Sequence, residues 1–327
     1  MTVYKVKTVE GEEEALKILN PNLEFLLERN VLFIEQILDR LKRRHGAKYE
    51  VARMILEDVK EWIKRDVNFQ NFLEKDRLFR EQNDGFTAAG FQYRMVVPRS
   101  KGPASRYFMR EEYVEGDNLT QWKKLEQEGH DMKQVVSLIV KNYVVQLRRG
   151  MVHSDVHVGN FRVTRDKRIA IFDRNFYLEL SPDIQDLVNT LLNPVALLTL
   201  SSDQLIDKLI KIAGKDIPKR DRAVLAKSWE RAKEGILSGD WKRSSNFLVD
   251  LRQHGLKLPL EVTLIFKNLN SLQQMSRQAG FNHLVEAYLY AADGGTRQTP
   301  DRRLELPQAT PLRGRIPAKL LVPAQSP

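Results

Sequence analysis

Apolar residues recur every three or four positions along much of the chain, which predicts a protein built mainly of helices. The clearest stretch is 135–147, which is followed by two arginines and by Gly150, a common helix ending. Residues 22–84 keep the same spacing over a longer distance, and 259–272 predicts a core helix that begins at a proline. A serine and a proline at 181–182 mark the start of another helix.

Short strands are predicted where this spacing breaks. Residues 1–21 predict a hairpin, and 91–97 and 107–109 predict two further strands of the same small sheet. A second hairpin is expected between 160 and 172, with a polar turn at 165–167. Helices combined with separate sheets indicate an α+β fold, and 327 residues of which 42% are apolar suffice for two lobes.

The loop before the second hairpin carries the most informative residues. Asp155 is followed five positions later by Asn160, and Asp173 ends the return strand of the hairpin. Because the two strands pair, we expect Asn160 and Asp173 to lie close together. This order is typical of kinase-like phosphotransferases, in which the first Asp orients the attacking hydroxyl and the other two residues hold Mg²⁺. The sequence therefore predicts Asp155 as a catalytic residue, Asn160 and Asp173 as metal ligands, and ATP with Mg²⁺ as cofactors.

Two other interpretations use the same residues. A solvated loop can hold these polar side chains without any function. His153, Asp155 and His157 also suggest a zinc site, but the chain has no cysteine and no further ligand is spaced nearby. The order of helix, loop, hairpin and aspartate favours the phosphotransferase.

The motif His-x-Asp-x-His-x-Gly-Asn at 153–160 resembles the catalytic loop of the UbiB/AarF/ADCK family of atypical kinase-like proteins. Residues 15–18, Ala-Leu-Lys-Ile, are similar to the strand that carries the phosphate-binding lysine, and 112–116 resembles the hinge between lobes. The resemblance runs from about Tyr4 to about Tyr290.

This resemblance implies a two-lobed, protein-kinase-like fold. Residues 1–116 would form the small lobe with its long helical segment and hinge, and 117–290 a mostly helical large lobe. Residues 291–327 are rich in proline and are expected to form a disordered tail.

The resemblance also implies roles in nucleotide binding. Lys17 would contact the α- and β-phosphates, and Glu74 is the candidate for the helix carboxylate that pairs with it. Glu112, at the start of the hinge, would lie beside the nucleotide.

Within the catalytic loop, His153 would support the backbone. His157 would stabilise the transferring charge when it is protonated, because ordinary kinases have a lysine there. Arg174, next to the metal-binding aspartate, would supply a permanent charge in its place.

The chain departs from the family pattern in three places. It begins almost inside the second strand, which implies a small lobe truncated at its N-terminus and lacking the family's Lys-x-Gly-Gln motif and phosphate loop. Asp173 is followed by Arg174-Asn175 rather than Phe-Gly, and Val156 and Val158 stand where the family has prolines.

Net charge bears on the binding partners of the chain, and cysteine content bears on its cellular compartment. The net charge is +10, yet no nucleic-acid recognition motif is present, so we expect a solvated basic surface, with peripheral contact to acidic lipid headgroups as the alternative. The absence of cysteine excludes disulfides and fits the cytoplasm, and no apolar stretch is long enough to span a membrane.

Three functions fit these features. The first is an ATP-dependent kinase or ATPase of the UbiB/AarF type, for which the resemblance implies a lipid or quinone pathway. The second is a pseudokinase that acts as a nucleotide-binding interaction module. The third is a small-molecule phosphotransferase of the aminoglycoside or choline kinase kind. The hinge and His157 favour the first family over the third, and the intact Asp155, Asn160 and Asp173 favour an enzyme.

Overall fold

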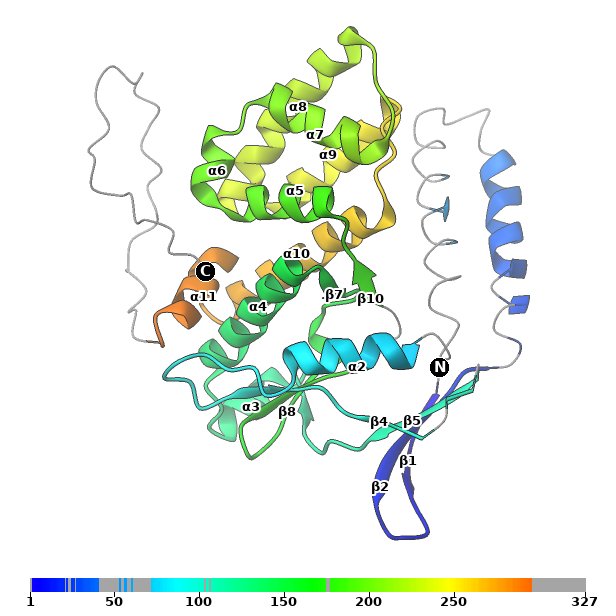
Figure 1. Cartoon of the computed structure of the whole chain (residues 1–327), viewed down its shortest axis with the longest axis vertical. Coiled ribbons are helices and arrows are strands. Elements are labelled where there is room, and N and C mark those ends of the chain that lie inside the picture. The colour runs from blue at the N-terminus through cyan, green and yellow to red at the C-terminus, as the bar shows by residue number, and fades with distance from the viewer. Residues whose placement is uncertain are drawn as a thin grey trace. The chain divides into compact units, whose positions relative to one another are not determined.

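The structure is a computed structural model that describes residues 2–20, 22, 25–26, 28–40, 53, 56–57, 60, 72–102, 104–105, 107–174 and 177–295. Within these residues the chain alternates between small sheets and a set of helices (Figure 1). Residues 28–40 are helical, whereas residues 61–71 of the predicted helical segment 22–84 lie outside the described residues.

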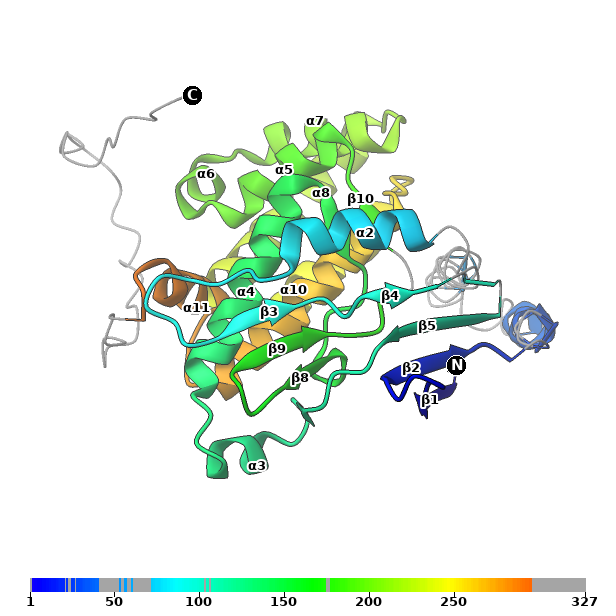
Figure 2. The ribbon, with the colours of Figure 1, turned by 60° about the horizontal axis from the view of Figure 1, so that its bottom comes forward.

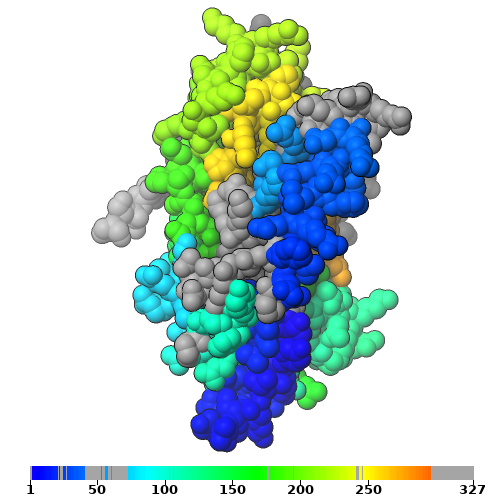
Figure 3. All heavy atoms as spheres, turned by 90° about the vertical axis from the view of Figure 1, so that its right-hand side faces the viewer, coloured from blue at the N-terminus to red at the C-terminus, as the bar shows by residue number. Residues whose placement is uncertain are grey.

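The first sheet contains the predicted N-terminal hairpin. Strand β1 (Thr2–Lys7) pairs antiparallel with β2 (Glu13–Ile18), and β2 pairs in turn with β5 (Phe108–Glu112) and β5 with β4 (Ser100–Lys101). Figure 3 shows the hairpin as the dark blue projection at the bottom of that view. Lys17 lies opposite Met109 in this sheet, with both side chains buried.

The second sheet is built around the predicted catalytic hairpin. Strands β8 (Phe161–Val163) and β9 (Arg168–Ile171) pair antiparallel, β6 (Asp117–Asn118) adds to β8, and β3 (Arg94–Val96) adds to β9 (Figure 2). The prediction that 91–97 and 107–109 share one sheet is therefore wrong. β3 instead runs parallel to β9, and its buried Met95 packs in the core that helix 132–149 also lines.

A two-stranded sheet completes the β structure. Strand β7 (Met151–His153) pairs antiparallel with β10 (Tyr177–Glu179), so that the residues before and after the catalytic hairpin are tied together.

Helix α4 (Met132–Arg149) is the centre of the described core. Asp131 caps its first turn by accepting hydrogen bonds from two backbone amides, and Gly150 ends it with a positive φ of 81°. Helix α4 contacts α5, α10, α11 and β7, and its apolar face belongs to one continuous hydrophobic core. This confirms the helix predicted from the 135–147 pattern.

From residue 72 onward, the other described helices are α2 (Phe72–Asn83), α3 (Trp122–Gln127), α5 (Pro182–Leu192), α6 (Pro194–Thr199), α7 (Ser202–Ala213), α8 (Lys219–Ser238), α9 (Trp241–Gln253), α10 (Leu260–Gln278) and α11 (Leu284–Ala292). Of these, α5, α10 and α11 contact α4 directly, and α7, α8 and α9 pack on one another. Ser181 caps α5 as predicted, with Pro182 in the first turn. Helix α11 continues past residue 290, and the rest of the expected tail from 296 lies outside the described residues. None of the described helices is both long enough and apolar enough to cross a membrane.

Candidate active site

The catalytic loop follows β7 and ends in the short 3₁₀ helix η1 (Val158–Asn160), and the side chain of His153 hydrogen-bonds to its backbone. Nδ1 of His153 accepts a hydrogen bond from the backbone N–H of Asp155 at 3.0 Å, so Nε2 carries the proton and donates to the carbonyl of Phe172 at 3.0 Å. Burial lowers the pKa of His153 to about 4, and the ring is therefore neutral at pH 7. Because both ring nitrogens are engaged within the protein, the arrangement does not suit a zinc ligand.

Helix α10 fixes the same loop from the other side. The amide of Asn268 is fully buried; its Oδ1 accepts from Val156 N–H at 3.0 Å. Its Nδ2 lies 3.0 Å from the carbonyl of His153, 3.2 Å from that of Ser154 and 3.0 Å from the hydroxyl of Tyr143. One side chain thus satisfies the backbone of the loop on both flanks of Asp155.

Two cationic or ionisable groups flank the carboxylate of Asp155. Nζ of Lys267 lies 2.6 Å from Oδ1, and Nε2 of His157 lies 3.4 Å from Oδ2. Burial acts to raise the pKa of Asp155, but the hydrogen bond and charge of Lys267 outweigh it, and the pKa lies below its ordinary value. Nδ1 of His157 accepts from Gly159 N–H and so fixes the ring beside Asp155.

The two predicted metal ligands are brought together by the hairpin. Phe172 N–H donates to the carbonyl of Asn160 at 2.8 Å, and the Asn160 amide donates to the carbonyl of Asp155 at 2.8 Å. The Asn160 Oδ1 accepts no hydrogen bond from any residue in the described part of the chain. Asp173 adopts a left-handed backbone with φ 55°, and its buried Oδ1 has no hydrogen-bond partner among the residues that the structure describes.

These two oxygens fit a magnesium ion. Mg²⁺ prefers oxygen ligands and is commonly held by one or two carboxylates together with nucleotide phosphates and water. No group of three or more His, Cys, Asp or Glu side chains suited to a metal occurs among the residues that the structure describes. The donor set therefore suits an ion that shares its coordination with phosphate.

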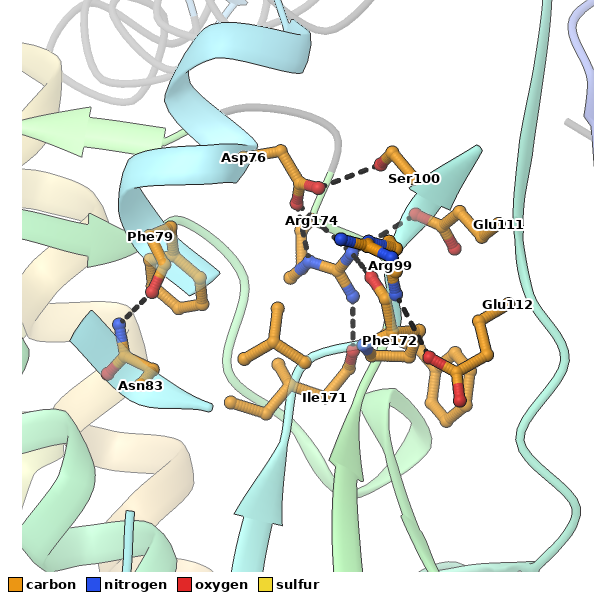
Figure 4. Close-up of polar contacts among 12 residues, drawn as sticks. Asp76, Phe79, Asn83, Arg99, Ser100, Glu111, Glu112, Ile171, Phe172 and Arg174 are labelled. Atoms are coloured by element: carbon orange, nitrogen blue, oxygen red, sulfur yellow. Dashed lines mark hydrogen bonds and ion pairs between the residues drawn. The ribbon is translucent and has the colours of Figure 1, made fainter. Parts of the chain in front are cut away.

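Lys17 on β2 forms an ion pair, but with a different residue from the one expected. Its Nζ lies 2.8 Å from Oε2 of Glu111, and the two side chains are 4% and 1% exposed. Glu74 points to solvent from α2, so the prediction that it pairs with Lys17 is wrong. Glu112 is half-buried at the end of β5, where its Oε2 accepts from Arg99 N–H at 3.4 Å (Figure 4).

Arg174 also differs from its prediction. Its guanidinium is fully buried and bonded to Asp76 of α2 and to Glu111 of β5 (Figure 4). It is therefore not free to neutralise a transferring phosphate as the sequence suggested.

Four residues of the site were not predicted from the sequence: Lys267, Asn268, Glu111 and Asp76. A signal existed for Glu111, because side chains alternate along a strand and Met109, two residues earlier, is an inward-facing core residue. For Asn268 the only signal was a polar residue on the apolar face of a predicted helix. Lys267 and Asp76 resemble ordinary surface charges until the helices are packed.

The fold of this chain is similar to that of a solved structure. The complex of Rv3197 with erythromycin from Mycobacterium tuberculosis superposes with a TM-score of 0.51 at 16% identity, covering 90% of this chain and 75% of that protein. This likeness concerns the fold alone.

Comparison with curated proteins gives distant relatives. AarF domain-containing protein kinase 1 of Xenopus laevis is 21% identical over 305 residues, which are 88% of this chain and 57% of the relative. An uncharacterized protein of Synechocystis sp. is 22% identical over 198 residues, which are 58% of this chain and 48% of the relative. The chain thus spans about half the length of the curated relatives it matches.

The family model of the ABC1 atypical kinase-like domain matches residues 1–203, which is more than half of the chain. The match includes Lys17, the catalytic loop and Asp173, and it agrees with the mixed helical and sheet architecture of a kinase-like fold. The chain belongs to the ABC1 atypical kinase-like family.

Proposed function

We propose that this chain binds magnesium and a nucleotide, and uses ATP as a kinase or ATPase. The observation that carries the proposal is the buried, unpaired Oδ1 of Asp173 beside Asn160. A buried acceptor without a partner costs about 1–3 kcal/mol, and a left-handed backbone at a non-glycine residue adds strain. Such costs are typical of a site that is completed by its ligand.

The other residues have corresponding roles. Asp155 orients the hydroxyl of the acceptor or a water molecule, while Lys267 and His157 hold its carboxylate in place. Lys17 contacts the phosphates. Its ammonium has three N–H donors and pairs with one carboxylate oxygen of Glu111, which leaves donors for phosphate oxygens. A magnesium ion at Asn160 and Asp173 would supply charge neutralisation of those phosphates.

A second candidate is a pseudokinase that binds nucleotide without transferring phosphate. The observation that favours it is the burial of Lys17, whose side chain is 4% exposed and already paired. A nucleotide reaches this ammonium only if neighbouring side chains move. The two candidates differ in turnover and not in binding.

The test is titration calorimetry of ATP into the full chain with and without Mg²⁺. We expect magnesium-dependent binding that Asp173→Asn abolishes. The matched control is Asp183→Asn, which removes a carboxylate on α5 that pairs only with Lys211 among the described residues and should bind as the parent does. A folded chain that binds no nucleotide at millimolar concentration would contradict the proposal.

Phosphate release and phosphate transfer to lipid, quinone-precursor, small-molecule and protein acceptors then separate the candidates. Release or transfer that is lost in Asp155→Asn supports the kinase or ATPase. Binding without either supports the pseudokinase. A lipid or quinone precursor, reached by a cytoplasmic protein in peripheral contact with the membrane, is the acceptor class we propose to assay first.

A further inference from the structure

Arg174 joins three segments that are distant in the sequence. It follows Asp173 directly, and its side chain is 0% exposed. Its guanidinium donates to five acceptors, most of which are drawn in Figure 4. They are Asp76 Oδ1 (3.1 Å), the Tyr177 hydroxyl (3.2 Å), Glu111 Oε1 (3.2 Å) and the carbonyls of Ile171 (2.6 Å) and Pro98 (2.9 Å).

The surrounding charges are balanced. Two buried cations, Lys17 and Arg174, face two buried carboxylates, Asp76 and Glu111. Glu111 divides its oxygens between the cations, with Oε2 at Lys17 and Oε1 at Arg174. Loss of one charge from such a group leaves another uncompensated in the interior, which is strongly unfavourable. The position of Glu111, and with it that of Lys17, therefore depends on Arg174.

This arrangement replaces a direct contact between helix and strand. In kinase-like sites a carboxylate of the helix packed on the small-lobe sheet pairs with the strand lysine. Here the buried carboxylate of α2 is Asp76, and it reaches Arg174, with its second oxygen accepting from Ser100 at 2.7 Å. The path from α2 to Lys17 runs through Arg174 and Glu111.

We propose that Arg174 is a positioning residue of the nucleotide site, which couples helix α2 to Lys17 through Glu111 and holds the loop of Asp173 in the same cluster. The coupling to nucleotide rests on the function proposed above, whereas the placement of Lys17 does not. The full chain is therefore tested twice, once without and once with nucleotide.

The first test measures how fast Lys17 reacts with an amine-acylating reagent, followed by peptide mapping, with exposed Lys123 as the internal reference. The variant is Arg174→Met combined with Asp76→Asn, which removes one charge of each sign. We expect Lys17 to be protected in the parent and to react roughly tenfold faster in the variant. Tyr177→Phe removes the hydroxyl that accepts from Arg174 and donates to Asp76 but removes no charge, and Lys17 should stay protected. Equal protection of Lys17 in the parent and the double variant would overturn the proposal.

The second test is a double-mutant cycle on the dissociation constant for ATP with Mg²⁺. The charge-balanced pair of substitutions and Lys17→Met should each weaken binding by roughly tenfold, and together no more than Lys17→Met alone. Additive losses would show that Arg174 acts independently of Lys17 and would overturn the coupling. If the parent binds no nucleotide, the proposed function fails, and the reactivity of Lys17 alone decides whether Arg174 positions it.

Discussion

Lys267 and Asp155 lie 112 positions apart in the sequence, yet the ammonium of one is 2.6 Å from the carboxylate of the other. Lys267 is the exposed neighbour of Asn268, the buried residue that fixes the backbone of the catalytic loop. Helix α10 thus supplies both the anchor of the loop and a cation for its aspartate. Within the loop itself, the residue two positions after the aspartate is His157.

The first prediction concerns Lys267. Under the proposed function, Lys267→Met should lower turnover by roughly 10- to 100-fold, because the Asp155 carboxylate loses the contact that orients it. The dissociation constant for the nucleotide should change by less than about twofold, since Lys267 contacts neither Lys17 nor the metal ligands. Steady-state assays and calorimetry give the two values.

Lys267→Arg keeps the charge and should recover much of the turnover. Lys257→Met is the matched control, an exposed lysine just before α10 with no ion pair among the described residues. Full turnover in Lys267→Met would show that the contact has no part in catalysis.

The second prediction concerns Asn268, which anchors the backbone of the catalytic loop. Asn268→Ala removes the partner of the Val156 N–H and of two carbonyls in the buried loop. Leaving such groups unsatisfied should lower the free energy of unfolding by roughly 2–4 kcal/mol. Urea denaturation measures this. Asn270→Ala, on the same helix, removes a side chain that makes no hydrogen bond to any described residue and should cost less than about 1 kcal/mol. Equal losses in the two variants would contradict the anchoring role.

The third prediction concerns pH. His153 stays neutral in the folded chain down to its pKa of about 4, whereas the unfolded chain takes up the proton near pH 6.5. Between these values the unfolded state binds more protons, so stability falls as the pH falls through this window. The contribution of His153 at pH 5 should be about 2 kcal/mol lower than at pH 7.5.

His153→Asn cannot be protonated in this range and should lack that part of the pH dependence, although it is less stable at pH 7.5. Urea denaturation of both proteins at the two pH values gives the difference. Parallel curves for parent and variant would show that His153 takes up its proton equally in both states.

The fourth prediction concerns the effect of Asp173 on the free energy of unfolding. Without Mg²⁺, Asp173→Asn should raise the free energy of unfolding by about 1 kcal/mol, because it replaces a charged carboxylate that has a buried, unpartnered oxygen among the described residues by a neutral amide. Asparagine tolerates the left-handed backbone as aspartate does. Asp173→Ala lacks that tolerance and should gain less. Thermal unfolding with and without Mg²⁺ and nucleotide is the measurement, and a less stable Asp173→Asn chain would argue against an unsatisfied site.

The parts of this protein that the sequence determined are local. The spacing of apolar residues predicts helix α4, Gly150 ends it, and the turn at 165–167 brings the strands of the catalytic hairpin together. Asn160 and Asp173 become neighbours through that hairpin alone, because paired strands place residues opposite one another without help from the rest of the chain.

The tertiary structure decided which charged residues pair, which strands are neighbours and which helix contacts the catalytic loop. Glu74 and Asp76 lie two residues apart on one helix, and Glu111 and Glu112 are adjacent on one strand, but only Asp76 and Glu111 face the interior. Strand β3 joined β9 rather than β5, and α10 brought Lys267 and Asn268 to a loop more than a hundred residues away. These outcomes depend on how the helices and sheets pack around one core. A shift of one residue along a strand, or of a fraction of a turn along a helix, exchanges a buried charge for a solvated one, and local spacing does not contain that information.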